Sequence, residues 1–83
     1  MIKAYVLLTL RMGDTKSVLK ELKQIEHIES IAVVAGIYDI ILSVQVKDLE
    51  ELYELTYNNI SNITGISETT TFVVEKEIKP EED

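Results

Sequence analysis

The segment VVAGIYDIILSVQV, from Val33 to Val46, carries a single carboxylate, Asp39, in an otherwise apolar run. An unpaired charge is costly to remove from water, so Asp39 needs either a partner or a place at a turn. With Gly36 just before it, Asp39 fits a hairpin turn in which its side chain bonds to the backbone. It fits equally well a carboxylate at a hairpin tip that faces the cationic group of a ligand. The residue types leave both interpretations open.

A second candidate is the run Thr69-Thr70-Thr71. Threonine is a favourable strand residue, and a strand alone explains the run. The three hydroxyls are also hydrogen-bonding groups that suit a small polar ligand. The strand interpretation is the simpler one, and the ligand interpretation stays open beside it.

The remaining polar residues do not suggest catalysis. His27 is the only histidine, it has no identifiable partner group, and we expect it in an exposed loop between a helix and a strand. The paired acids Glu50-Glu51 and Glu75/Glu77 fit solvated helix and strand edges. The sequence contains no Cys or His cluster for a metal, no glycine-rich phosphate loop and no serine elbow. We therefore expect no enzyme, no cofactor and no metal site.

The composition is that of one small domain. A chain of 83 residues has a marginal core, for which oligomerisation is a common aid. The absence of cysteine excludes disulfides and fits a reducing, cytoplasmic location. No apolar run approaches the ~20 residues of a membrane span. The first ten residues, MIKAYVLLTL, alternate like a strand and lack a small-residue cleavage site, so we expect no targeting segment.

The charge is acidic, at −7 for the whole chain. Without Glu81, Glu82 and Asp83, 12 acids face 8 bases, which leaves −4. Affinity for a phosphate backbone comes largely from Lys and Arg, and no basic cluster is apparent in the sequence. We therefore expect no direct binding to nucleic acid.

The hydrophobic periodicity predicts the elements that must position these residues. Alternation over residues 2–10 predicts a first strand. Asp14 or Thr15 then caps a helix. Its apolar side carries Val18, Leu19, Leu22 and Ile25. Residues 27–30 connect this helix to a second strand.

The rest of the chain is predicted to form a hairpin, a second helix and a last strand. Strands at 31–35 and 38–46 form a hairpin through Gly36, which we expect to adopt a positive φ. Asp48 caps a second helix, with Glu51 completing a capping box. The predicted inner stripe of this helix consists of Leu49, Leu52, Tyr53, Thr56 and Ile60. Residues 58–65 end the helix, and a last strand covers 69–78.

The order βαββαβ predicts an α+β, ferredoxin-like fold, with two helices on one face of a four-stranded antiparallel sheet. The other sheet face is also too apolar for free solvent. Its apolar residues come from the first, third and last strands and include Tyr5, Leu7, Ile41 and Phe72. We expect a second copy of the same surface to cover it, which gives a twofold dimer.

Two stretches of the chain resemble a known family. The segment IESIAVVAGIYDIILSVQVKDLEELYEL contains an apolar run, G-x-Y-D, an apolar strand and a D-x-x-x-L helix start. The segment ITGISETTTFVVEKEIK resembles a P-G-V-x-x-T-x-T approach to a last strand, with Thr64 where proline is usual and Ile66 where valine is usual. Together they resemble the RAM domain, the effector-binding module of the Lrp/AsnC (feast/famine) regulators. The resemblance covers residues 1–79, and residues 80–83 form an acidic tail.

The resemblance implies a function. Family members usually carry a helix-turn-helix domain in front, and because the first strand begins at the start of this chain, the sequence resembles the stand-alone RAM proteins. The family forms dimers that assemble further, often as four dimers in a ring, with amino-acid effectors between dimers near the G-x-Y-D hairpin. Carried over by position, this points to a ligand site at Gly36, Tyr38 and Asp39, with Thr69 to Thr71 nearby. Asp39 would pair with the α-amino group of the ligand.

The resemblance therefore predicts a module without catalysis that binds amino acids, forms oligomers and associates with full-length Lrp/AsnC regulators. An ACT-like regulatory subunit of an amino-acid enzyme is the main alternative, because it shares the βαββαβ order. A dimeric, cofactor-free monooxygenase-like enzyme also shares that order. It is disfavoured because His27 lies in a loop and no Trp or second His lines a pocket.

Overall fold

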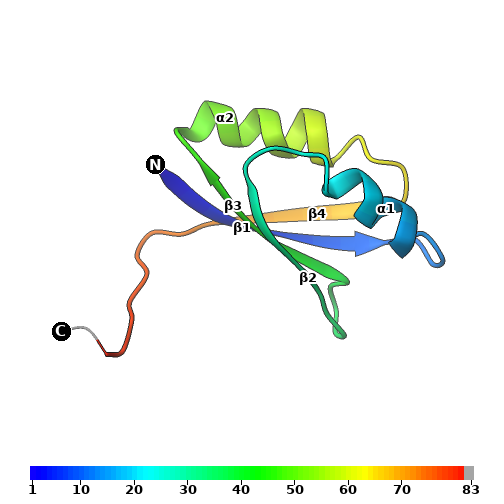
Figure 1. Cartoon of the computed structure of the whole chain (residues 1–83), viewed down its shortest axis with the longest axis horizontal. Coiled ribbons are helices and arrows are strands. Elements are labelled where there is room, and N and C mark those ends of the chain that lie inside the picture. Colours follow the sequence, from blue (N-terminus) through cyan, green and yellow to red (C-terminus); the bar gives the residue numbers. More distant parts are fainter. Residues whose placement is uncertain (82–83) are drawn as a thin grey trace.

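The structure, a computed structural model, describes residues 1–81, and the end of the predicted acidic tail lies outside them. Its four strands form one antiparallel sheet in the order β2-β3-β1-β4 (Figure 1). The elements in chain order are β1 (Ile2–Leu10), α1 (Thr15–Leu22), β2 (Ile28–Val33), β3 (Ile40–Val46), α2 (Leu49–Tyr53), the π-helix η1 (Glu54–Ile60) and β4 (Ile66–Val73). The predicted ferredoxin-like α+β fold is confirmed. No helix in residues 1–81 is both long enough and apolar enough to cross a membrane.

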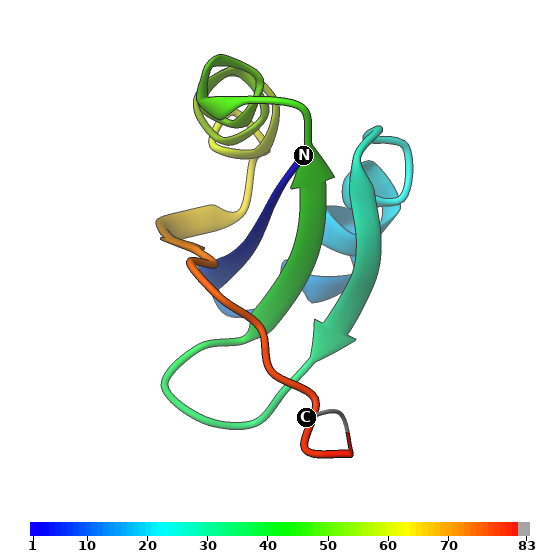
Figure 2. The same ribbon diagram turned by 90° about the vertical axis from the view of Figure 1, so that its left-hand side faces the viewer.

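The core lies between the sheet and the helices, which share one side of the sheet (Figure 2). Alternate residues of the two central strands point into it, as the period of two requires. The fully buried side chains of this layer include Val6 and Leu8 from β1, Leu42 and Val44 from β3, Val18 and Leu22 from α1, and Leu55 and Ile60 from η1. Burying each of these side chains contributes about 1.5–3 kcal/mol.

The second helix departs from the predicted stripe. Asp48 caps it as predicted, because its carboxylate accepts from the Glu51 backbone N–H at 2.9 Å. The helix then widens into a π-helix over Glu54–Ile60, where the hydrogen bonds span five residues instead of four. Leu55 and Ile60, five residues apart in this π-helix, are both buried, whereas Tyr53 of the predicted stripe, at the end of α2, is 57% exposed. Leu49 was placed in the same stripe and is also exposed.

The strand boundaries also move. β2 begins at Ile28, three residues before the predicted start, because the His27 carbonyl already accepts from the Gln45 N–H of β3. β3 begins at Ile40, so Tyr38 precedes the strand. β4 spans Ile66–Val73 instead of 69–78, because β1, the strand it pairs with, starts at Ile2 and offers no partner beyond the bond from Val74 N to Lys3 O.

A tight contact joins the start of α1 to the start of β4. Gly65 has a φ of 108°, and a Cβ added to it would lie 2.9 Å from the Asp14 Cβ and from a Val18 methyl group. Its carbonyl also accepts from the Arg11 N–H at 2.8 Å. Only glycine fits this backbone conformation and this space, so Gly65 fixes how closely α1 packs against the sheet.

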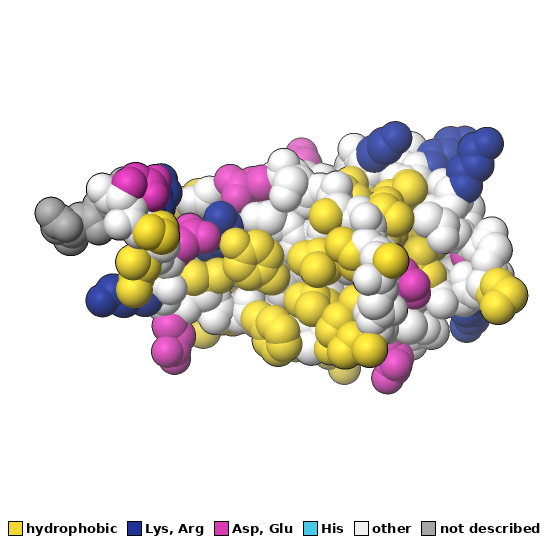
Figure 3. All heavy atoms as spheres, turned by 90° about the horizontal axis from the view of Figure 1, so that it is seen from below, with side chains coloured by type: hydrophobic (Ala, Val, Ile, Leu, Met, Phe, Trp, Pro, Cys, Tyr) yellow, Lys and Arg dark blue, Asp and Glu magenta, His cyan; other side chains and the backbone are white. Residues whose placement is uncertain are grey.

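Within residues 1–81, no helix covers the other face of the sheet. Across the ladder Tyr5 pairs with Phe72, and Leu7 pairs with Ile41 on one side and Thr70 on the other. Phe72 is 54% exposed, and apolar side chains gather over the strands on this side of the molecule (Figure 3). The predicted apolar second face is therefore present, and we call it the open face.

Candidate functional site

Asp39 lies at the base of the β2–β3 connection, where its carboxylate faces the central strand β1. Its Oδ2 accepts a hydrogen bond from the Leu10 N–H at 2.8 Å. Its own N–H donates to the Leu8 carbonyl at 2.9 Å, and its carbonyl accepts from the Val34 N–H at 2.9 Å. The side chain is half-buried. Asp39 therefore joins three segments of the sheet.

The bond to Leu10 has a local cause. The Leu8 carbonyl accepts from the Asp39 N–H, whereas the Arg11 N–H donates to the Gly65 carbonyl, so the backbone groups of even-numbered β1 residues face β3 and those of odd-numbered residues face β4. The β1–β3 ladder ends at the pair Leu8–Ile40, so the Leu10 N–H has no ladder partner on the β3 side. The Asp39 carboxylate accepts from this amide instead, across 29 positions of sequence. The expectation of a side chain that bonds to backbone agrees with this geometry, but the backbone belongs to another strand and not to the turn.

The tip of the connection is formed by Gly36 and Ile37. Ile37 is 86% exposed, and nothing lies within 4 Å of the position where a Cβ of Gly36 would be. The predicted positive φ of Gly36 is wrong, since among residues 1–81 positive φ occurs at Gly13, His27 and Gly65. The connection from Val34 to Asp39 is wide enough to reverse the chain without a left-handed residue. Tyr38, the third predicted residue of this segment, is half-buried.

The three threonines are divided between the two faces of the sheet. Thr70 pairs with Leu7 and lies on the open face, whereas Thr69 and Thr71 pair with Leu8 and Val6, whose side chains point to the helices. Thr69 and Asp39 lie on opposite sides of β1 at the same level of the sheet. Thr69 pairs with Leu8, and the Asp39 N–H donates to the Leu8 carbonyl. Two strand spacings put their backbones roughly 10 Å apart. The structure therefore brings the two predicted segments to the same end of the sheet without direct contact.

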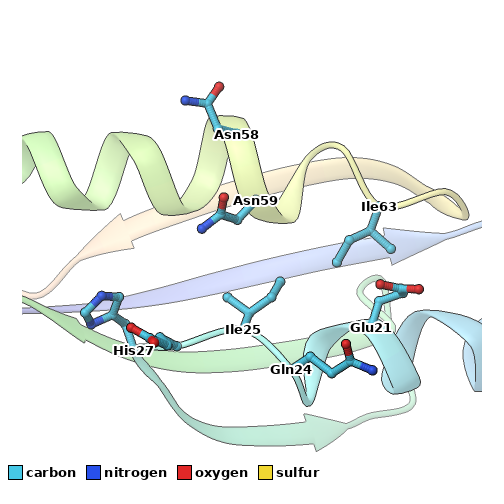
Figure 4. A pocket seen from close by; sticks show the side chains of 8 residues that line it. Glu21, Gln24, Ile25, His27, Asn58, Asn59 and Ile63 are labelled. Carbon is cyan, nitrogen blue, oxygen red and sulfur yellow. The ribbon is translucent and has the colours of Figure 1, made fainter.

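A hollow that the sequence did not predict lies between α1 and η1 (Figure 4). Its volume is about 550 Å³, and Ile25 and Ile63 form part of its wall. Its polar lining comes from Glu21, Gln24, Glu26, His27, Asn58 and Asn59. His27 is exposed and lies 3.9 Å from a Glu51 carboxylate oxygen. The positive φ of His27 and the contact between two helices that create this hollow are tertiary features without a sequence motif.

The hollow does not suggest chemistry. Within the part of the chain that the structure describes, no three His, Cys, Asp or Glu side chains come together in a way that could hold a metal ion. The polar groups of the hollow are exposed amides and carboxylates together with the His27 imidazole. It is therefore a surface depression of the helix layer, away from the residues that the sequence singled out.

One charged contact borders the open face. The Lys3 ammonium lies 3.4 Å from a Glu77 carboxylate oxygen, which also accepts from the Tyr5 hydroxyl at 3.3 Å. The negative charge of Glu77 raises the pKa of Lys3 above its usual value of 10.5. This contact ties the segment after β4 to the first strand.

Comparison with known proteins gives a consistent result. The family model described as the Lrp/AsnC ligand binding domain matches residues 3–83. The structure of TTHA0845 from Thermus thermophilus is similar with a TM-score of 0.89 and 25% identity, over 95% of this chain and 99% of that one. No match was found among curated proteins.

Two longer proteins share the fold. Escherichia coli AsnC superposes with a TM-score of 0.87 at 22% identity, over 92% of this chain and 52% of its own. The transcriptional regulator NMB0573 of Neisseria meningitidis, solved as a complex with L-Met, gives a TM-score of 0.82 at 17% identity, over 94% of this chain and 52% of its own. This chain therefore spans about half the length of these two regulators.

Proposed function

Because the chain belongs to the Lrp/AsnC ligand-binding domain family, we propose that it is a regulatory module that binds an amino-acid effector and assembles with copies of itself. The family is one of regulatory ligand-binding domains and not of enzymes. The observation that carries the proposal is the family match over residues 3–83, which includes both candidate segments. The same match favours this function over that of an ACT-like enzyme subunit.

The ligand chemistry follows from Asp39. A carboxylate has about four acceptor positions, so the bond from the Leu10 amide to Oδ2 leaves capacity for a second donor. We assign that capacity to the ammonium group of an amino acid, in a charge-assisted bond. Gly36 contributes exposed backbone to the same connection, and Tyr38 offers a half-buried ring and hydroxyl. The L-Met complex of the fold relative NMB0573 supports an amino acid as the class of ligand.

The threonines take a lesser part in this site. At roughly 10 Å from Asp39, Thr69 is too far away to share one small amino acid with it directly. We propose that the ligand lies at a seam between two dimers, where a second molecule supplies the remaining groups. Thr70 and Thr71 then act by shaping β4 beside the seam.

The open face supports the assembly. Apolar side chains, among them Tyr5, Ile41 and Phe72, gather over β1, β3 and β4 on this face, and Phe72 is more than half exposed in the single chain. A twofold dimer would bury this surface against its own copy. We further propose that such dimers associate into a ring of four dimers and also with full-length regulators of the family. The chain itself is acidic and is not expected to bind DNA directly.

A thermal-shift screen of the amino acids tests the effector assignment. A ligand that binds the folded state at ~100 times its Kd adds ~2.7 kcal/mol to the free energy of unfolding. We expect one or a few amino acids to raise the melting temperature, and the corresponding amine without the carboxylate to do so less. If no amino acid changes the melting temperature at millimolar concentration, the effector assignment is wrong.

A further inference from the structure

The outer surface of the helix layer is divided by charge into two parts. Helix α1 carries a shallow groove of about 770 Å³, and Lys16, Leu19, Lys20 and Lys23 line it. We call this the basic groove. Its three lysines are separated in sequence, so no basic cluster was apparent there, but the helical turn brings them to one face.

The second helix carries the complementary chemistry. Leu49, Tyr53 and Tyr57 are spaced four residues apart and are 61%, 57% and 62% exposed. Glu50 and Glu54 are exposed immediately beside the two rings. We call these five residues the acidic aromatic ridge.

The side chains of the ridge hold defined positions relative to one another. The rings of Tyr53 and Tyr57 are stacked, with centroids 4.8 Å apart and an angle of 18° between their planes. The Asn58 amide donates to the Glu54 carboxylate at 2.6 Å, which orients that acid beside the rings. Rigid aromatic side chains provide contact area at low entropic cost, so a preformed stack favours recognition. Large exposed apolar groups in a row, bordered by polar ones, are typical of interaction sites.

Charge complementarity identifies what fits the ridge. A lysine ammonium is attracted both to the face of a tyrosine ring and to a carboxylate, and the basic groove offers three lysines around an apolar residue. Within one chain the two surfaces do not meet, because the side of α1 that faces η1 is occupied by the hollow lined by Glu21 and Asn59. The ridge and the groove of one chain can therefore bind each other's counterpart only on another molecule.

We propose that the acidic aromatic ridge of one copy docks into the basic groove of a second copy. Two copies that each use both surfaces form a closed pair, whereas a copy that uses its ridge and its groove with two different neighbours extends the contact into a ring or a chain. It uses the helix layer and leaves the open face free for a twofold dimer. Because its charges are exposed, the association should be weak and sensitive to salt.

Paired charge reversals test the proposal with a built-in control. Lys16→Glu with Lys20→Glu gives a chain with two acidic surfaces, and Glu50→Lys with Glu54→Lys gives a chain with two basic surfaces. Sedimentation velocity would compare each variant, their equimolar mixture and the wild type at about 50 mM and about 500 mM salt, where the Debye length falls from about 14 Å to about 4 Å. Circular dichroism melts would establish that each variant folds. Lys16→Gln with Lys20→Gln provides a neutral substitute should the reversal fail to fold.

We expect the wild type at low salt to exceed the size of a dimer and to shrink at high salt. Each reversed variant alone should lose this association by at least 10-fold in Kd, and the mixture should regain it, because the acidic copy then pairs with the basic one. A wild type that has the same size as both variants at low salt overturns the proposal, as does a mixture that does not recover. Amino-acid binding and the open-face dimer are measured separately, so either can fail without the other.

Discussion

The open face and the outer helix layer are both exposed in the single chain, but they differ in how their chemistry is arranged. The open face is mainly apolar around Tyr5, Leu7 and Phe72, with Thr70 and Ser43 beside them and the Lys3–Glu77 contact at its border. The helix layer instead separates basic groups on α1 from acidic and aromatic groups on α2 and η1. An apolar surface complements its own copy across a twofold axis, whereas a surface divided by charge complements a second copy by joining its acidic part to the basic part of that copy. One small domain can therefore carry two modes of association.

The largest expected effect comes from a charge on the open face. Phe72→Glu would place a carboxylate in the middle of a dimer contact, and by symmetry two of them. Burying an unpaired charge there costs several kcal/mol, so we expect the dimer Kd to rise by at least 1000-fold, about 4 kcal/mol. Sedimentation equilibrium measures this change. Tyr57→Glu is the matched control, because it adds the same charge to an equally exposed aromatic residue of the helix layer and should keep the open-face dimer.

Gly65→Ala should displace α1 of the helix layer and so lower the stability of the fold. Gly65→Ala introduces a Cβ that meets the Asp14 Cβ and a Val18 methyl group at 2.9 Å, in a backbone conformation with φ of 108°. The strain of that conformation and the displacement of α1 together should cost about 2–4 kcal/mol of unfolding free energy in a urea titration. Gly13→Ala has a similar φ of 88° and nothing within 4 Å of the new Cβ. It should cost about 1–2 kcal/mol, and equal losses for both variants would contradict the close packing at Gly65.

The smallest effect concerns the border of the open face. Glu77 raises the pKa of Lys3 in the folded state, so the stabilisation it provides is complete below the usual value of 10.5 and is lost as pH rises through the higher folded value. Glu77→Gln should therefore lower the pKa of Lys3, measured by NMR titration of its side chain. It should change the melting temperature little, because the pair is exposed. A Lys3 pKa unaffected by Glu77→Gln would show that the contact does not form in solution.

Much of the fold could be predicted because it depends on local periodicity. The alternation in residues 2–10 and the capping box at Asp48 are short-range signals, and both elements form where they indicate. The π-helix was missed because a change from a period of 3.6 to a wider turn has no residue signature. Leu49 and Tyr53 precede the π-helix, and they are exposed because α2 buries Leu52 instead, which leaves the acidic aromatic ridge on the outside.

In the candidate site, too, the local pattern was predictable and the contacts between distant residues were not. Gly36, Tyr38 and Asp39 were identified from a local pattern, and they do form one connection. The partner of the Asp39 carboxylate was not predictable, because Leu10 is distant in sequence and its amide lies just beyond the end of the β1–β3 ladder. The division of Thr69, Thr70 and Thr71 between two faces follows from the register with β1, which no single strand encodes.

Because of the bond from Leu10, Asp39→Ala would report on stability as well as on ligand binding. Removing the carboxylate deletes a charge-assisted bond to the backbone, so Asp39→Ala should lose about 1.5–3 kcal/mol of stability whether or not a ligand binds. Asp39→Asn keeps an oxygen acceptor of the same shape for the Leu10 N–H but removes the negative charge. The asparagine variant therefore separates the structural role of this residue from its proposed role in binding.

The most direct test is calorimetric titration of Asp39→Asn and the wild type with the amino acid that the thermal-shift screen selects. We predict that the variant keeps its melting temperature to within a few degrees and binds the ligand at least 30-fold more weakly, about 2 kcal/mol, because the ammonium has lost its carboxylate. A variant that binds the ligand with wild-type affinity would contradict the account, because Asp39 would then serve only to join β1 to the β2–β3 connection.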